Sequence, residues 1–137
     1  MKICIIDPSS QIYTTVGYWI FTEPNNTGEL IIEVSKMTDW RFEWAVIGHE
    51  LIEAMFCWLF GITTEECDKF DGRCEREFAS GDRCKSIEPG FDKECPYRIG
   101  HILGAAWEYA WIHLSLASWS EYDEECNRLM GITPSIF

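Results

Sequence analysis

The sequence predicts a single α+β domain, in which a small antiparallel sheet of about three strands packs against three to four helices. Segments rich in β-branched and aromatic residues fill the first 36 positions, and apolar residues at helical spacing fill most of the remainder. The chain has 137 residues, a length typical of one domain with one hydrophobic core.

The expected strands occupy the N-terminal part, over residues 2–7, 13–22 and 29–36. β-branched and aromatic side chains are favoured in such half-buried segments. The sequence PNNTG at 24–28 supplies turn-forming residues between the second and third strands. We therefore expect residues 1–37 to form the sheet and 38–130 to form the helical part of the same domain.

The expected helices cover residues 39–60, 63–79, 96–117 and 118–130. Thr38 or Asp39 can cap the first helix, and Gly61 suits its C-terminal end. Thr63 with Glu66 forms a capping-box pattern at the start of the second helix. Residues 80–95 mix glycine, proline and charged residues, which predicts an irregular excursion between the second and third helices.

The net charge of −12, with only eleven lysines and arginines, argues against direct binding of nucleic acid, because phosphate-binding surfaces need clustered cations. A metal ion, a peptide or protein substrate, or a basic protein partner remains compatible with this charge. The apolar stretch 44–60 is shorter than a bilayer span and contains two glutamates, so we expect no membrane segment.

Seven cysteines are present, and the N-terminal sequence MKICIIDPSS lacks the features of a secretory signal. An odd number of thiols without an export signal favours reduced cysteines and a cytoplasmic location. The cysteines form no CxxC pair. The roles of the helical and loop cysteines stay open; these are Cys67, Cys74, Cys84 and Cys95.

The stretch 44–60, WAVIGHELIEAMFCWLF, carries ionisable residues within an apolar helix. His49 and Glu53 are four residues apart and share one face, and Glu50 lies at the edge of that face. A buried carboxylate needs a hydrogen-bonding partner, an opposite charge or a metal ion. A plain buried His–Glu pair is the structural alternative.

Further metal-ligand residues recur in the next two helices. Asp71 falls within the apolar stripe of the second helix, whereas Asp68 points away from it. His101 and Glu108 lie seven residues apart on one line of the third helix, where Gly100 and Gly104 allow close packing. We expect a divalent metal ion on His49, Glu53 and His101, with Asp71 as a fourth ligand or an orienting group and Glu108 hydrogen-bonded to His101 or the ion.

The string HELIE at 49–53 resembles the HExxH helix of zincin metallopeptidases, with Glu53 in place of the second histidine. The resemblance implies that His49 and Glu53 are ligands, that Glu50 is the general base, and that an edge strand beside the helix binds an extended substrate. Zinc is the expected ion. The additional carboxylate also admits harder ions such as manganese or iron.

A wider part of the chain, about residues 30–110, resembles small tailed-phage proteins. The matching strings are TDWRFE at 38–43, HELIEA at 49–54, CDKFD at 67–71 and PYRIGH at 96–101. This resemblance implies a phage or prophage origin and a zincin-like metal site. An acidic residue usual in that family before the last histidine is replaced here by Gly100.

The favoured function is therefore a metal-dependent hydrolase of peptide or amide bonds. One alternative is a non-enzymatic acidic phage protein that binds and inhibits a host factor. Another is a magnesium or manganese nucleotide pyrophosphohydrolase, because Glu50 with Glu53 forms ExxE and Asp68 with Asp71 forms DxxD. Neither the substrate nor the oligomeric state follows from the sequence.

Overall fold

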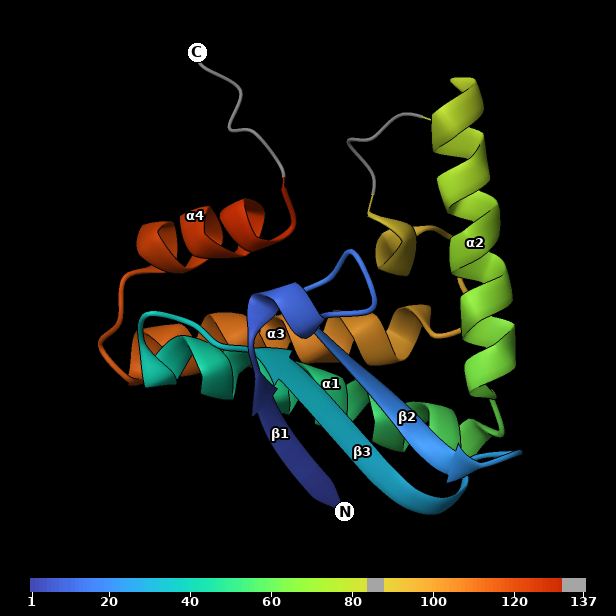
Figure 1. Cartoon of the computed structure of the whole chain (residues 1–137), viewed down its shortest axis with the longest axis horizontal. Helices are drawn as coiled ribbons and strands as arrows, with labels where there is room; N and C mark the ends of the chain where they lie inside the picture. Colours follow the sequence, from blue (N-terminus) through green and yellow to red (C-terminus); the bar gives the residue numbers. More distant parts are fainter. Residues whose placement is uncertain (84–87, 132–137) are drawn as a thin grey trace.

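The computed structural model describes residues 1–83 and 88–131 and confirms the α+β fold class. Helix α1 lies between the sheet and α3, while α2 stands across one end of this pair and α4 follows α3 at the other end (Figure 1). The elements are β1 (Lys2–Ile6), η1 (Pro8–Ser10), β2 (Gly17–Glu23), β3 (Thr27–Ser35), α1 (Trp40–Phe60), α2 (Thr64–Ser80), η2 (Pro89–Phe91), α3 (Arg98–Leu114) and α4 (Trp119–Leu129).

The sheet is mixed, so the prediction of an antiparallel sheet was wrong for its first strand. The strand order is β1-β3-β2, with β1 parallel and β2 antiparallel to β3. After β1 the chain skips one strand position to form β2, and β3 then fills the position between β1 and β2. The most buried segment takes this central position: Ile32 and Val34 of β3 are fully buried.

The predicted turn between the second and third strands is confirmed. Asn25 and Asn26 both adopt the left-handed conformation, with φ of 57° and 54°. Two consecutive residues with positive φ are the requirement of the tight hairpin turn whose twist matches the flanking strands, and asparagine tolerates it well. The Asn26 side chain also donates to the Ile62 carbonyl oxygen at 2.6 Å, which ties this turn to the end of α1.

Helix α1 begins and ends where its capping residues predict. The Asp39 side chain accepts from the Arg41 amide, and Gly61 ends the helix in the left-handed conformation with φ of 68°. Its buried face carries Ala45, Val46, Ala54 and Cys57 toward the sheet and α3. This helix contributes both to the hydrophobic core and to the polar cluster described below.

The later helices agree with the prediction apart from their ends. The capping box of Thr63 and Glu66 opens α2, and the Ser118 hydroxyl caps α4. The third helix starts at Arg98, so the expectation that Pro96 lies in its first turn was wrong. In the excursion 80–95, the residues on either side of 84–87 are described and include the short turn η2; Cys84 lies outside the described residues.

Among residues 1–83 and 88–131, no single helix is long and apolar enough to span a membrane. Helices α1 and α2 meet such a criterion only as a pair bent by 116° at the break between them.

Candidate metal centre

Three side chains from α1 and α3 converge on one buried point. His49 Nε2 and His101 Nδ1 lie 3.1 Å apart, and Glu53 Oε2 is 3.3 Å from the first and 3.0 Å from the second. All three residues are buried. They form the one group of potential metal-ligand side chains found with mutually close donor atoms in the part of the chain that the structure describes.

Glycines allow the two imidazoles to reach this point. A Cβ atom on Gly104 of α3 would lie 2.8 Å from the Cγ atom of His49, closer than Cβ contacts ordinarily occur. A Cβ atom on Gly90 of η2 would lie 2.4 Å from the His101 ring. Gly100 similarly leaves room for the side chain of Phe56. The prediction that small residues bring another helix close to His49 is therefore confirmed.

Each imidazole contacts a second carboxylate through its outer nitrogen. His49 Nδ1 forms an ion pair with Glu108 without regular hydrogen-bond geometry, and His101 Nε2 lies 3.2 Å from Glu88 Oε1. Metal-binding histidines commonly have their outer N–H held by a carboxylate, which fixes the ring orientation and makes the inner nitrogen a better donor. Glu108 was expected on His101 or the ion, but the structure pairs it with His49.

The Glu53 carboxylate is fixed from its far side. The Trp19 indole N–H on β2 donates to Glu53 Oε1 at 3.0 Å, and this leaves Oε2 directed toward both histidines. Oε1 thus fixes the orientation of the carboxylate, and Oε2 is available as a ligand atom for a metal ion. The contact also brings the edge strand β2 against the centre.

Electrostatics favour protonated histidines and an ionised Glu53 in the absence of a metal ion. Burial opposes the charge on His101, but hydrogen bonds with Glu53 and Glu88 outweigh it and raise its pKa to about 9. Burial is likewise outweighed at His49, whose pKa is raised by Glu108 and Glu53. The pKa of Glu53 falls to about 2, because hydrogen bonds from His101 and His49 exceed the effect of desolvation. These pKa shifts favour protonation of the imidazoles that a metal ion would use as ligands.

Glu50 lies beside the cluster without joining the three donors. Its side chain is half-buried and faces Gly17 at the start of β2. A Cβ atom on Gly17 would be 3.2 Å from Glu50 Cγ. Desolvation and the negative charge of Glu53 raise the pKa of Glu50 to about 8. A carboxyl group with a pKa near neutrality can accept and return a proton, as a general base must.

Asp71 lies apart from the three donors. Its Oδ1 accepts a hydrogen bond from the Tyr97 hydroxyl at 2.5 Å, and the Tyr97 ring packs edge-on against His101 with centroids 6.2 Å apart. Burial raises the pKa of Asp71 to about 6, although the hydrogen bond from Tyr97 opposes that shift. Asp71 therefore reaches His101 through Tyr97. Asp68 points to the Tyr13 hydroxyl at 3.4 Å.

The arrangement of donors fits a divalent ion. Ligand atoms around a tetrahedral zinc ion with bonds of about 2.0–2.1 Å are about 3.3–3.4 Å apart, and neighbouring ligands of an octahedral ion are separated by about 3.0–3.1 Å. The observed separations of 3.0, 3.1 and 3.3 Å span both cases. Two imidazoles and one carboxylate form the donor set of catalytic zinc sites and also of open non-haem iron sites.

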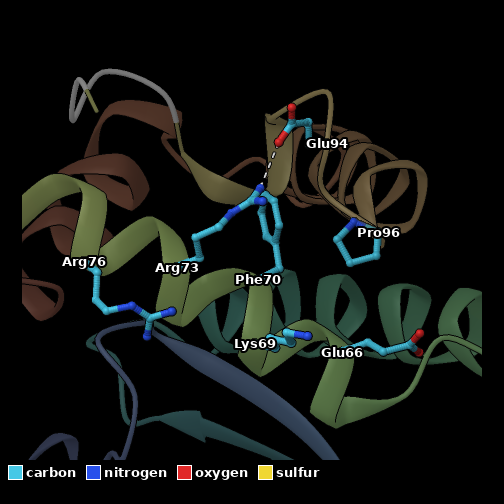
Figure 2. Close-up of a pocket in the computed structure, with 7 residues that line it drawn as sticks. All are labelled: Glu66, Lys69, Phe70, Arg73, Arg76, Glu94 and Pro96. Carbon is cyan, nitrogen blue, oxygen red and sulfur yellow. Dashed lines mark hydrogen bonds and ion pairs between the residues drawn. The ribbon is translucent and has the colours of Figure 1, made fainter. Parts of the chain in front are cut away.

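A separate surface hollow of about 320 Å³ lies against α2. Figure 2 shows Arg73 turned toward Glu94, with Phe70 beside it; the Arg73–Glu94 contact is 2.9 Å, and the guanidinium lies 5.2 Å from the Phe70 ring centroid. The other lining residues are Glu66, Lys69, Arg76 and Pro96. None of these side chains belongs to the three-donor group, so this hollow and the candidate chemistry lie at different places.

Two contributors to the centre, Trp19 and Glu88, were not expected from the sequence. The position of Trp19 in an alternating strand signals only an inward side chain, and Glu88 stands before Pro89 in the irregular excursion, where no periodicity indicates its direction. His113 is exposed, and its Nδ1 contacts the Tyr109 carbonyl oxygen, so it takes no part in the cluster.

The chain matches no family model, no curated protein and no solved structure. The resemblances to zincins and to tailed-phage proteins therefore stay predictions, and the proposed function depends on the geometry of the centre.

Proposed function

We propose that the protein is a divalent-metal-dependent hydrolase, with a peptide or amide as its substrate class. His49, Glu53 and His101 hold the ion, which is zinc in the first instance and manganese or iron in the second. Glu50 serves as the general base. Glu108 and Glu88 position the two imidazoles, and Asp71 acts on the centre through Tyr97.

One observation carries this proposal: the three inner donor atoms lie within 3.3 Å of one another, while each imidazole has its outer nitrogen against a carboxylate. A simple buried His–Glu pair would satisfy its hydrogen bonds with fewer groups. Burying two imidazoles with the Glu53 carboxylate and most of the Glu108 carboxylate costs desolvation energy, and a bound cation offsets that cost.

The residues of the chain divide the chemical work. A divalent ion held by His49, Glu53 and His101 would supply Lewis acidity and would lower the pKa of a water molecule bound to it. Trp19 keeps Glu53 Oε1 occupied, so that Oε2 points inward. Glu50 would accept a proton from the metal-bound water, and a neighbouring cation would favour the ionised form of Glu50 that can do so. β2 is an edge strand whose Trp19 touches the centre, and an extended peptide can pair with such an edge.

Metal analysis tests the binding part of the proposal. Chelator-treated protein is titrated with Zn²⁺, Mn²⁺ and Fe²⁺, and we expect one ion per chain. The double variant His49→Ala, His101→Ala should bind at least about 100-fold more weakly, because it lacks two of the three ligands. His113→Ala, which removes an exposed histidine, is the matched control. Equal binding by the wild type and the double variant, or none by either, contradicts the proposal.

A second experiment tests the catalytic part. The metal-loaded wild type is incubated with a mixed peptide library, and new termini are detected by mass spectrometry. Glu50→Gln should bind metal with the same stoichiometry but cleave about 10²–10⁴-fold more slowly, the usual contribution of a general base. Cleavage at an unchanged rate would remove Glu50 from the chemistry. Metal binding with no cleavage of peptides or amides would indicate a structural ion.

The same proposal includes a phage or prophage origin and a cytoplasmic location. The origin rests on the four matching sequence strings described above, and the location rests on the odd number of cysteines.

A further inference from the structure

The sides of α1 and α3 that point away from the sheet and the metal centre are apolar and open to solvent. Met55 and Trp58 of α1 are 52% and 58% exposed, and Leu103 of α3 is 50% exposed. Trp44 and Ile99 are exposed to a similar degree. Since α1 and α3 pack side by side (Figure 1), these side chains belong to one surface, which we call the bare face.

The bare face has the residue spacing of a helix-packing seam. On α1 these positions alternate in steps of four and three residues: Trp44, Gly48, Leu51, Met55 and Trp58. Gly48 is covered by the Trp107 ring of α3, and Trp44, Met55 and Trp58 are the exposed members. On α3 the same steps give Ile99, Leu103, Ala106 and Ala110. Apolar residues at this spacing are those by which one helix packs into the grooves of another. Two antiparallel helices with such seams need a second helical layer to bury them.

The bare face is large and almost free of charge. Its five large side chains are each about half-exposed and together present roughly 600 Å² of surface, so that two copies would bury about 1,200 Å², the lower end of the range for a specific interface. The largest apolar patch of an ordinary monomer is about 300–600 Å². Arg41 is the charged residue on the outward arc of α1, although the chain as a whole carries −12. In the described part of the chain, the large side chains of this face remain about half-exposed.

We propose that the bare face is the interface of a homodimer, in which α1 and α3 of two copies pack as a four-helix layer. A second copy supplies the same seam spacing, the same uncharged surface and a matching area, as a two-fold interface requires. The small exposed residues Ala106 and Ala110 allow the helices of the second copy to approach α3 closely. A membrane surface is disfavoured, because anionic lipids attract basic helices and this chain is strongly acidic.

The dimer is independent of the candidate metal centre, whose three donors are buried on the inner side of the same helices. The charged residues of each copy are carried mainly by α2, α4 and the loops, so their mutual repulsion should weaken with added salt. We therefore expect the association to persist or strengthen as ionic strength rises. A partner held by charge would show the opposite dependence.

The test is the mass of the full chain in solution, measured by light scattering and sedimentation at about 10 µM and at tenfold dilutions. We expect twice the chain mass for the wild type and the single-chain mass for Leu103→Glu and, separately, Met55→Glu. Each places a charge on the bare face at a half-exposed position, so the fold should be retained, as checked by circular dichroism. Ile12→Glu, at a 70% exposed position in a loop outside this face, is the matched control and should remain dimeric.

Tryptophan fluorescence provides a second readout, because Trp44 and Trp58 would leave water on association. Their emission should shift to the blue with increasing protein concentration in the wild type but not in Leu103→Glu. A wild-type chain that is monomeric at every concentration overturns the proposal, whether or not it binds vesicles or another protein through this face. A dimer that both Leu103→Glu and Met55→Glu leave intact also overturns it.

Discussion

Helices α1 and α2 follow one another across Gly61, yet they relate to the rest of the protein differently. α1 is apolar on all sides and packs between the sheet and α3. α2 has a narrow buried stripe formed by Cys67, Phe70 and Cys74, and the rest of its surface is polar. The chain bends by 116° between the two helices, so α2 crosses the end of the α1–α3 pair (Figure 1).

This difference determines which ionisable residues come together. Gly104 has no side chain to hold α3 away from α1. His49 and His101 therefore lie within 3.1 Å of each other. On α2, no neighbouring helix approaches Gly72, where a Cβ atom would meet only the Arg76 side chain at 3.5 Å, and Asp71 accepts a hydrogen bond from the Tyr97 hydroxyl. From the sequence, Asp71 could be either a fourth ligand or an orienting group beside His49 and His101. The closeness of the helices distinguishes them.

The largest effect is expected from alkaline pH, which should reduce the stability that the His–Glu cluster between α1 and α3 gives the metal-free protein. Because the pKa of His101 is raised from 6.5 to about 9 in the folded state, its stabilising contribution is present below pH 6.5 and is lost as pH rises through 9. We expect the free energy of unfolding of the apoprotein to fall by a few kcal/mol between pH 6.5 and 9, and a falling Tm would show this. His101→Asn should flatten the profile, whereas His113→Asn should preserve it.

Metal should reverse this trend, since the ion displaces the protons that the histidines hold. Apparent metal affinity should therefore increase with pH up to about 9. An apoprotein Tm that rises between pH 6.5 and 9 would contradict the assignment of protonated histidines.

Substituting Gly104→Ala should disturb both the fold and the centre. The new Cβ atom would lie 2.8 Å from His49 Cγ, so the helices or the imidazole must move. Overpacking of this kind typically costs about 1–3 kcal/mol. We expect a lower Tm and weaker metal binding, measured by calorimetry. Unchanged metal affinity would show that the approach of α3 to His49 does not control the ligand geometry.

Substituting Glu108→Gln tests the carboxylate behind His49. Loss of such a group usually reduces metal affinity by about 10–100-fold, and metal titration of the folded variant measures it. Glu88→Gln should have a smaller effect, because the Glu88 side chain is 61% exposed whereas that of Glu108 is 20% exposed. A larger loss in Glu88→Gln would reverse the proposed ranking of these two carboxylates.

Substituting Gly72→Ala on α2 should stabilise the protein, in contrast to Gly104→Ala. A Cβ atom at Gly72 meets only the Arg76 guanidinium at 3.5 Å, which is ordinary contact. Alanine in a helix is favoured over glycine, by about 0.4–1 kcal/mol at a compatible position. Chemical denaturation should show this gain with metal affinity unchanged. A loss of stability would indicate that α2 packs more tightly than its contacts suggest.

The smallest effect on metal binding is expected for Asp71→Asn. The amide oxygen can still accept the hydrogen bond from Tyr97, and the three donors are untouched. Metal affinity should remain within about twofold of that of the wild type, whereas loss of a ligand should reduce it far more. A drop of tenfold or more would identify Asp71 as a ligand in the metal-bound state.

The local features of the fold were accessible from the sequence because they depend on neighbouring residues. Gly61 ends α1, Thr63 and Glu66 open α2, and the asparagines at 25 and 26 form the hairpin turn, since each acts through backbone conformation within a few positions. The placement of β1 beside β3 was missed. Strand order depends on contacts across the sheet, and a strand of given composition can pair in either direction.

For the candidate centre, the sequence alone determined that His49 and Glu53 share one face, because helical periodicity fixes residues four apart. It also indicated that His101 lies on a glycine-rich helix able to come close. Only the tertiary structure decided that Glu108 meets His49, that Glu88 and Trp19 complete the surroundings, and that Asp71 ends on Tyr97. These contacts join distant segments, so they follow from how the helices cross and how closely they pack, which no local pattern encodes.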